Sequence, residues 1–431
     1  MDFWTPPTAT TPVSGRVTVP GSKSEANRAL LLAALGDGPS RVTGLPTSRD
    51  TSLMTDALTA LGALVDPSDP DEVTITPPAT WKGGSDIDCG LAGTVMRFVP
   101  PVAMLAGGPV RFHGDPRASE RPMSPLLSAL IALGATVLGD DGCPTDALPF
   151  ILTPPARWLD DPVTIDATTS SQFVSGLLLA GASYPNGLDL RHEGGPLPSR
   201  PHIDMTVAML AAHGVAASLP EPDRWLVPPA PLYAVDAVID PDLTNAAAFL
   251  LAGVITGGRT EVANWPARTT QPGDMIREII ESFGGFVHRQ ADGSLVAGSD
   301  NSLMRTDLNL SAASELAPVV AGLAAVAPGV SHLTGIGHIR GHETDRLAAI
   351  ADALAAVGVD AQADDDGLTI TGGRARHGGT IESRGDHRMV HLGALLALVT
   401  PGVTVTDPDA VAKTMPDFAE RWTALVAGGA A

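Results

Sequence analysis

Hydrophobic positions along the chain fall into helical segments of two alternating kinds. The first kind is apolar on nearly every face, a pattern typical of a helix buried on all sides. Recurrence at a fixed spacing indicates that one structural unit is repeated along the chain. Residues at the starts of these segments are 70 to 77 apart by residue number: Ser24, Thr94, Ser171, Thr244, Glu315 and His387.

The second kind of helical segment is amphipathic and ends in a glycine before a short strand-like run, as in ALTALGALVD. A glycine directly after a helix supplies the left-handed residue that terminates it. The last helical segment, FAERWTALVAGG, fits the same pattern. These glycines are 70 to 80 apart by residue number: Gly62, Gly134, Gly214, Gly284, Gly358 and Gly428.

Each apolar helix is followed by a turn rich in Gly or Pro and by a run typical of a β-strand. The repeated unit is therefore a buried helix, a strand, an outer amphipathic helix and one or two further strands. It spans about 72 residues and occurs six times, which predicts an α/β protein. The strand-like runs are residues 40–45, 108–114, 187–194, 259–265, 330–336 and 402–408.

Composition limits the class of protein. A chain of 431 residues exceeds the roughly 250–300 residues that one hydrophobic core serves, so two or more domains are expected. The formal net charge of -21 argues against nucleic acid or an anionic membrane as the main partner. No apolar run reaches the roughly 18 residues of a membrane span, and the start MDFWTPPTATTPV lacks the features of a secretion signal. Cys89 and Cys143 are the only cysteines, which fits a reducing cytosol.

Basic and polar side chains gather at the starts of the buried helices, beginning with Lys23, Ser24 and Arg28. A helix N-terminus carries unpaired N–H groups and about half a positive charge, so it favours anions. The segment is no Walker A loop, because five residues separate Gly15 from Gly21 and that motif has four. The alternative is that Ser24 only caps the helix and the charges are solvated. Taken together, the helix starts predict a positive, anion-binding cleft between two groups of three helices.

Seven motifs in register resemble the 5-enolpyruvylshikimate-3-phosphate (EPSP) synthase family across essentially the whole chain. They are PGSKSEANRALLLAAL, LAGTVMRF, SERPMSPLLSAL, SSQFVSGLLLAG, HIRGHETDRL, GDHRM and KTMPDF. The resemblance implies an inside-out α/β barrel in two domains, with three βαβαββ repeats in each and helix N-termini facing the interdomain cleft. It places residues 1–19 and 241–431 in one domain and 20–240 in the other, with a hinge near 19–20 and 240–242.

The same resemblance implies a reaction and its partners. The enolpyruvyl group of phosphoenolpyruvate is transferred to the 5-hydroxyl of shikimate 3-phosphate, with release of phosphate, by addition and elimination through a tetrahedral intermediate. No metal and no organic cofactor are implied. The family suggests a monomer that acts on these two small anions. Composition favours a cytoplasmic location, with neither nucleic acid nor membrane as a partner.

Roles for single residues are also implied by the resemblance. Glu315 matches an acidic base, Lys23 a lysine that contacts both ligands, and Glu343 a second carboxylate for proton transfer. Arg97 also matches a family position and is interpreted as structural. The positions matching shikimate 3-phosphate contacts are Lys23, Ser24, Arg28, Ser170, Ser171, Gln172, Ser199, Glu315 and His342. Those matching phosphoenolpyruvate contacts are Lys23, Gly93, Arg121, Gln172, Arg346, His387, Arg388 and Lys413.

Four positions depart from the family pattern. His342 stands where many relatives have a lysine, so a fixed cation is replaced by a group that titrates near neutral pH. His338 replaces an asparagine, His202 a tyrosine and Leu91 an asparagine. A further expectation concerns Glu343 and Arg346, three residues apart, which either serve the reaction or form a surface ion pair worth at most about 1 kcal/mol.

Three other functions are compatible with parts of this pattern. The enolpyruvyl transferase that acts on UDP-N-acetylglucosamine has the same architecture, but it typically carries a reactive cysteine where this chain reads DPRASERPM. A non-catalytic anion-binding repeat protein would not need Glu315, Glu343 and Lys23 together. RNA 3′-end cyclases share a related repeat, and the acidic charge and missing nucleotide motif argue against one.

Overall fold

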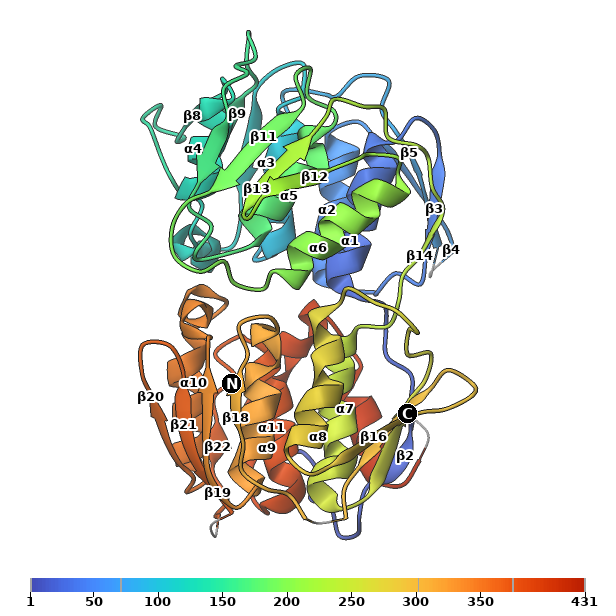
Figure 1. The fold of residues 1–431 in the computed structure, drawn as a ribbon, viewed down its shortest axis with the longest axis vertical. Coiled ribbons are helices and arrows are strands. Elements are labelled where there is room, and N and C mark those ends of the chain that lie inside the picture. Colours follow the sequence, from blue (N-terminus) through green and yellow to red (C-terminus); the bar gives the residue numbers. More distant parts are fainter. Residues whose placement is uncertain (1, 70–71, 301, 374–375, 430–431) are drawn as a thin grey trace. The chain divides into compact units, whose positions relative to one another are not determined.

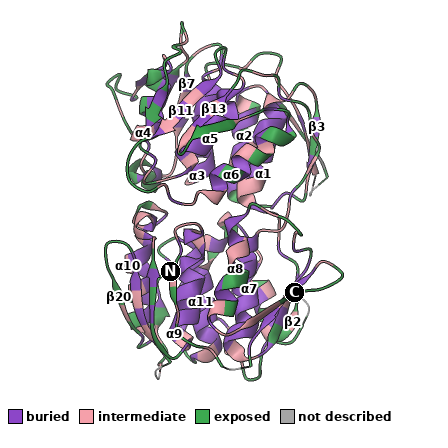
Figure 2. Ribbon diagram, viewed as in Figure 1, coloured by how far each residue is buried: buried purple, intermediate pink, exposed green. Residues whose placement is uncertain are grey.

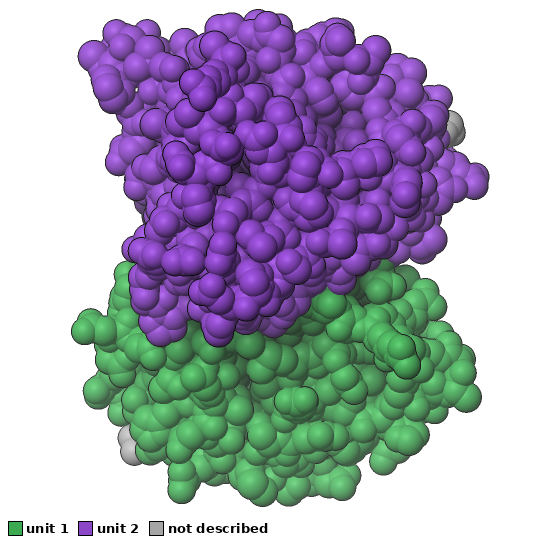
Figure 3. Space-filling model, turned by 45° about the horizontal axis from the view of Figure 1, so that its top comes forward, with its two compact units in different colours: residues 1–20, 240–431 green, residues 21–239 purple. Residues whose placement is uncertain are grey.

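The computed structural model describes residues 2–69, 72–300, 302–373 and 376–429. The chain divides into two compact units, which Figure 3 shows in different colours. Unit 1 consists of residues 1–20 and 240–431, and unit 2 consists of residues 21–239. Each unit has a separate hydrophobic core, built largely of alanine, leucine and valine.

The apolar segments form helices whose residues are mostly buried, as Figure 2 shows by colour. Their all-round apolar sequence is explained by contacts with other helices within the same unit. The predicted buried helices are thus confirmed. In unit 2 they are α1 (Lys23–Leu35), α3 (Gly93–Ala103) and α5 (Gln172–Gly181), and in unit 1 they are α7 (Leu243–Thr256), α9 (Ala317–Val326) and α11 (His387–Val399).

The amphipathic segments form a second set of helices that expose one face to solvent. Each ends before a glycine with a φ angle between 79° and 105°, the left-handed conformation predicted for it. The glycines are the six that the sequence pattern identified. The helices are α2 (Arg49–Ala60), α4 (Ser124–Ala132), α6 (Pro201–Ala212), α8 (Ile276–Ser282), α10 (Arg346–Ala356) and α12 (Phe418–Val426).

The strands of unit 2 form three sheets, each of four strands in the described residues (Figure 1). Within each sheet the first two strands are parallel, and the other pairs are antiparallel. The orders are β14-β3-β5-β4, β6-β7-β9-β8 and β10-β11-β13-β12. The strands are β3 (Ser40–Thr43), β4 (Leu64–Asp69), β5 (Glu72–Thr76), β6 (Asp86–Asp88), β7 (Val110–His113), β8 (Thr136–Leu138), β9 (Phe150–Thr153), β10 (Val163–Ile165), β11 (Leu188–His192), β12 (Ser218–Glu221), β13 (Arg224–Val227) and β14 (Ala237–Val238).

Two sheets of unit 1 repeat this arrangement, and its third sheet has three strands in the described residues. In the residues that the structure describes, its sheets have the orders β2-β15-β17-β16, β18-β19-β21-β20 and β1-β23-β22. All six runs expected to be strands contain one. The strands are β1 (Phe3–Trp4), β2 (Ser14–Val17), β15 (Arg259–Val262), β16 (Phe286–Arg289), β17 (Leu295–Gly298), β18 (Asp307–Asn309), β19 (Gly329–Thr334), β20 (Asp360–Ala363), β21 (Leu368–Gly372), β22 (Thr380–Ile381) and β23 (Thr404–Thr406).

Two strands pair with partners far away in sequence and so explain why unit 1 is discontinuous. Strand β2 runs parallel to β15, so the N-terminal segment supplies the first strand of a sheet that begins more than 200 residues later. Strand β14 runs parallel to β3, so the last residues of unit 2 add a strand to the sheet formed by its first residues. No helix in the described part of the chain is long and apolar enough to span a membrane.

Candidate active site

The first two turns of the buried helices of unit 2 are joined by hydrogen bonds. Asn27 of α1 donates to Thr94 of α3 at 2.6 Å, and Arg97 of α3 donates from Nη1 to Oε1 of Gln172 in α5 at 2.7 Å. The N-termini of these helices therefore lie at the same end of the bundle. Their partial positive charges add at this end and favour an anion there.

Lys23 begins α1 and pairs with a carboxylate that the sequence pattern did not identify. Its Nζ lies 3.0 Å from Oδ2 of Asp50, a buried residue in the first turn of α2. The cap of α1 is Ser22, whose hydroxyl accepts from the Glu25 amide at 3.4 Å, so the capping role considered for Ser24 is wrong. The only sequence signal for Asp50 is an acidic residue at the start of an outer helix.

Arg28 is almost fully buried, with 1 % of its surface exposed. Its Nε donates to Thr206 at 2.8 Å, and its Nη1 donates to the Ser24 carbonyl oxygen at 2.7 Å. Its Nη2 donates to Ser175 and to the His202 carbonyl oxygen. Arg28 thus links α1 to α5 and α6, and contact with a ligand stays a prediction.

Gly93 allows two polar side chains to approach the backbone at the start of α3. A Cβ atom at this position would lie 3.0 Å from Nη2 of Arg121 and 3.0 Å from Oε1 of Gln172. Arg121 follows η1, a 3-10 helix (Pro116–Glu120), and donates to the Leu91 carbonyl oxygen at 3.0 Å. The backbone of Leu91, where the family pattern has asparagine, thus supports one of the predicted cations.

The serines expected near phosphate lie at or close to the starts of helices in unit 2. Ser170 accepts from the Gln172 amide at 3.3 Å, and Ser171 is the buried residue directly before α5. Ser199 has a φ of 49°, a strained conformation for a residue with a side chain, shortly before α6. His202, in the first turn of α6, is buried.

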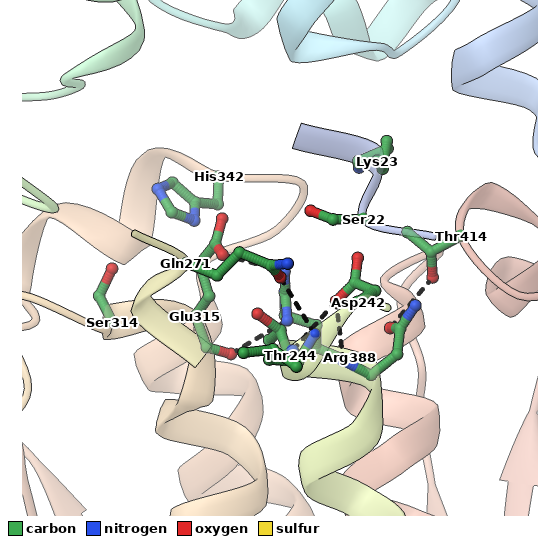
Figure 4. Close-up of polar contacts among 12 residues, drawn as sticks. Ser22, Lys23, Asp242, Thr244, Gln271, Ser314, Glu315, His342, Arg388 and Thr414 are labelled. Carbon is green, nitrogen blue, oxygen red and sulfur yellow. Dashed lines mark hydrogen bonds and ion pairs between the residues drawn. The ribbon is translucent and has the colours of Figure 1, made fainter. Parts of the chain in front are cut away.

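In unit 1, Glu315 lies in the short 3-10 helix η3 (Ser314–Leu316) that leads into α9. Its Oε2 is 3.4 Å from Nη2 of Arg388, and its carbonyl oxygen accepts from Nη1 of the same arginine at 3.2 Å. Figure 4 shows the two side chains approaching each other from separate helix starts. Arg388 is in the first turn of α11, so the starts of α9 and α11 meet.

Arg346, the first residue of α10, is surrounded by groups that accept hydrogen bonds. Its Nε is 2.7 Å from Oδ2 of Asp386, and its Nη2 is 3.2 Å from Oδ1 of the same carboxylate. Its Nη2 also donates to Glu343 at 2.5 Å, and its Nη1 donates to Nδ1 of His342 at 2.8 Å. Burial lowers the pKa of Arg346, but the carboxylates of Asp386, Glu343 and Glu315 outweigh burial and raise it.

Glu343 also contacts Lys413, whose Nζ lies 2.7 Å from Oε1. Lys413 ends the 3-10 helix η5 (Pro408–Lys413). The side chains of Arg346 and Glu343 are 2 % and 10 % exposed. The alternative of a surface ion pair is therefore wrong, because both partners are buried, and α10 begins after Glu343 rather than containing it.

The start of α7 is held by polar side chains that accept hydrogen bonds from its first amides. Asp242 caps the helix by accepting from the amides of Thr244 and Asn245, both at 3.0 Å. Gln271 accepts from the Leu243 amide at 3.1 Å (Figure 4). Thr414, next to Lys413, lies 3.4 Å from Oδ1 of Asn245.

Histidines are packed tightly in unit 1. His338, in the 3-10 helix η4 (Gly337–Gly341), has Nε2 2.9 Å from the Ser314 hydroxyl, and burial lowers its pKa to about 4. His387 is buried beside Asp386, with 3.6 Å between Nδ1 and Oδ1. His391 is buried one turn further along α11, against Phe418, and burial and the charge of Arg388 lower its pKa to about 3.

The described residues contain no group of three or more His, Cys, Asp or Glu side chains arranged to hold a metal ion. Cys89 is buried, Cys143 is exposed, and neither forms a disulfide. The loop Asp115–Met123, where the rival transferase has its cysteine, contains none. The two clusters present carboxylates, guanidinium groups, amines and imidazoles.

These features describe the class of protein: an α/β protein of two repeat-built units that presents cations and carboxylates at the starts of buried helices. A model of the EPSP synthase (3-phosphoshikimate 1-carboxyvinyltransferase) family matches residues 7–422. The chain belongs to this family. It is therefore an enolpyruvyl transferase of the shikimate pathway, acting on shikimate 3-phosphate and phosphoenolpyruvate.

Solved structures agree with this assignment. An EPSP synthase structure from Acinetobacter baumannii has a TM-score of 0.76 and 25 % identity, covering 99 % of this chain and 98 % of that one. A second structure of EPSP synthase from the same organism has a TM-score of 0.74 and 25 % identity, covering 97 % and 96 %. The similarity extends over both units.

Proposed function

We propose that two polar clusters act on the same two substrates, with separate roles. The cluster of unit 1 consists of Glu315, Glu343, Arg346, Asp386, Arg388 and Lys413, and the cluster of unit 2 consists of Lys23, Arg28, Gly93, Arg121 and Gln172 with the serines near the helix starts. The reaction joins a ring hydroxyl oxygen to C2 of phosphoenolpyruvate while C3 gains a proton. The tetrahedral intermediate then loses a proton from C3 and releases phosphate. These steps need an acid and a base together with cations for the carboxylate and the phosphate.

The base is Glu315, which removes the proton from the attacking hydroxyl or from C3. The observation that carries this proposal is its pairing with Arg388, a cation expected to hold phosphoenolpyruvate, at the joined starts of α9 and α11. Its side chain is 22 % exposed, more than that of Glu343. A carboxylate that is held by a cation and still accessible suits proton transfer to a ligand.

Lys23 is the candidate acid and contacts both ligands, while Glu343 shares in proton transfer. The contacts of Glu343 with Lys413 and Arg346 support this role, because they connect it to two cations of the expected phosphoenolpyruvate site. The remaining assignments also stand as proposals. Arg121, Arg346, Arg388, Lys413, Gly93 and His387 serve phosphoenolpyruvate, and Ser24, Arg28, Ser170, Ser171, Gln172, Ser199 and His342 serve shikimate 3-phosphate.

The experiment that tests this proposal follows phosphate release from purified protein mixed with shikimate 3-phosphate and phosphoenolpyruvate. UDP-N-acetylglucosamine replaces the first substrate in a parallel reaction and is expected to give no phosphate. Glu315→Ala is expected to lose turnover, and Glu382→Ala is the matched control, since Glu382 is a 70 % exposed carboxylate of unit 1. Release at the parent rate by Glu315→Ala would show that the base is wrongly assigned.

The hinge near residues 19–20 and 240–242 belongs to the same proposal. If both clusters bind one substrate pair, ligand binding should draw the units together. Small-angle scattering is expected to show a smaller radius of gyration with shikimate 3-phosphate, and an unchanged radius would argue against closure. A cytoplasmic monomer is expected, and sedimentation of the purified protein tests the oligomeric state.

A further inference from the structure

The hydrogen bonds of Arg346 leave little of its guanidinium for a ligand. An arginine side chain has five N–H groups and no acceptor. Asp386 receives Nε–H and one Nη2–H, and Glu343 receives the other Nη2–H. His342 receives one Nη1–H. One N–H, on Nη1, remains without a partner in the described part of the chain.

The contact with His342 fixes the protonation of that imidazole. Because a guanidinium only donates, Nδ1 of His342 must accept the 2.8 Å hydrogen bond from Arg346. A neutral imidazole with an accepting Nδ1 carries its proton on Nε2. The lysine that many relatives have at this position could not make this contact, because an ammonium group has no acceptor.

The surrounding charges are consistent with a neutral His342. Three cations of the cluster, Arg346, Arg388 and Lys413, lie beside three carboxylates, Glu315, Glu343 and Asp386. The cluster is thus balanced without a charge on His342. The ring of His338 lies 5.7 Å from that of His342 in an edge-on arrangement, and Glu315 and Asp366 favour a charge on His338 while Arg346 opposes it.

We propose that His342, in addition to its proposed contact with shikimate 3-phosphate, is a positioning residue for phosphoenolpyruvate: as a neutral imidazole it accepts a hydrogen bond from Arg346 and thereby orients the last N–H of that guanidinium toward the anionic ligand. This inference rests on the proposed role of Arg346 in binding phosphoenolpyruvate. Protonation of Nδ1 replaces the acceptor with a donor facing a cation, so the orientation is lost in acid. The substitution of lysine by histidine therefore changes how the arginine is held.

Kinetics against pH tests the positioning role. The KM for phosphoenolpyruvate is expected to rise by at least about tenfold in His342→Leu and His342→Lys at pH 7.5, since the hydrogen bond that is lost involves a charged group. His342→Asn places an amide oxygen near the position of Nδ1 and does not titrate. Its KM is therefore expected to change less between pH 8 and 6 than that of the parent, while the titration of the ligand's phosphate is common to all variants.

The matched control is His332→Asn, because His332 is an exposed histidine of unit 1 that pairs with Asp307. It should keep the parent pH profile. Equal KM values for His342→Leu and the parent, or a His342→Asn profile identical to that of the parent, would overturn the positioning role. Thermal unfolding of each variant identifies any that fails to fold. If His342→Leu or His342→Lys fails, the pH profile of His342→Asn tests the positioning role by itself.

Nitrogen-15 NMR of histidine-labelled protein tests the hydrogen bond without reference to activity. At pH 7.5 the signals of His342, assigned by their loss in His342→Asn, should show a protonated Nε2 and an unprotonated Nδ1. A protonated Nδ1 would overturn the inference whatever the activity. Failure of the parent to release phosphate would instead refute the proposed function, and the NMR result would still decide the protonation of His342.

Discussion

The two polar clusters hold their cations in different ways. In unit 2, Arg28, Arg97 and Arg121 donate to hydroxyl, amide and carbonyl oxygens. In unit 1, Arg346, Arg388 and Lys413 each contact a carboxylate. A neutral acceptor orients an arginine side chain, whereas a carboxylate also offsets its charge.

This difference suggests a division of labour between the units. Guanidinium groups oriented by neutral acceptors at joined helix starts suit the binding of phosphate and carboxylate groups, so unit 2 is expected to contribute mainly to affinity. Paired carboxylates and cations can exchange protons with a ligand, so unit 1 is expected to contribute mainly to turnover. Lys23 is the exception in unit 2, because its partner is Asp50.

The largest effect is expected for Glu315→Gln in unit 1. Removing a general base typically lowers turnover by about 10²–10⁴-fold, and the amide keeps the size of the side chain near Arg388. Steady-state phosphate release should show a large fall in kcat with a small change in KM. A variant that changed only KM would contradict the division between the units.

The second effect is expected for Arg121→Met in unit 2. Loss of a cation that binds an anionic ligand should raise the KM for phosphoenolpyruvate by about 10–100-fold, following the roughly 1.5–3 kcal/mol of a hydrogen bond to a charged group. The control is Arg117→Met, because Arg117 lies in the 3-10 helix directly before Arg121 but is half exposed and paired with Glu120. If kcat fell while KM held, unit 2 would have a role in the chemistry.

A smaller effect is expected for Gly93→Ala. The added methyl group would lie 3.0 Å from polar atoms of Arg121 and Gln172, so both side chains must shift by a few tenths of an ångström. Overpacking of this kind costs about 1–3 kcal/mol, and a rise of about tenfold in the KM for phosphoenolpyruvate is expected. Gly38→Ala, whose nearest contact would be 3.7 Å away, should behave as the parent does.

The smallest effect is on the stability of the protein in acid. It depends on a buried histidine of unit 1 and is measured without substrate. Burial lowers the pKa of His391 to about 3 in the folded protein. As the pH falls below about 6.5, this histidine therefore binds a proton in the unfolded chain while it stays neutral in the folded protein. The free energy of unfolding should therefore drop by about 2 kcal/mol between pH 6.5 and 5. His391→Leu should reduce this drop in urea unfolding, and His332→Leu, an exposed control, should not.

Local pattern was sufficient for most of the fold. Helices α1, α3, α5, α7, α9 and α11, the strands that follow them and the glycines with positive φ all lie where periodicity and turn chemistry placed them. These features depend on residues close together in sequence. Sequence resemblance, and not periodicity, supplied the reaction and the site residues.

Pairings between distant elements could not be predicted in this way. Nothing near Lys23 in the sequence indicates Asp50, and nothing near Arg346 indicates that Asp386 is 2.7 Å from it. Arg28 was expected near a ligand, and only the structure showed that it lies within a network of buried hydrogen bonds. Such contacts depend on how separate helices pack against each other, and this packing produces no periodic pattern in the sequence.

The sequence by itself determined the repeated unit, the buried and outer helices and the polar character of the helix starts. The reason is that the spacing of apolar and polar residues along a helix depends on which of its faces contacts solvent. Only the tertiary structure decided which charges compensate one another and that His342 accepts a hydrogen bond from Arg346. Charge and hydrogen bonding depend on distances of a few ångströms between side chains. Those distances are set only when elements remote in the chain pack together.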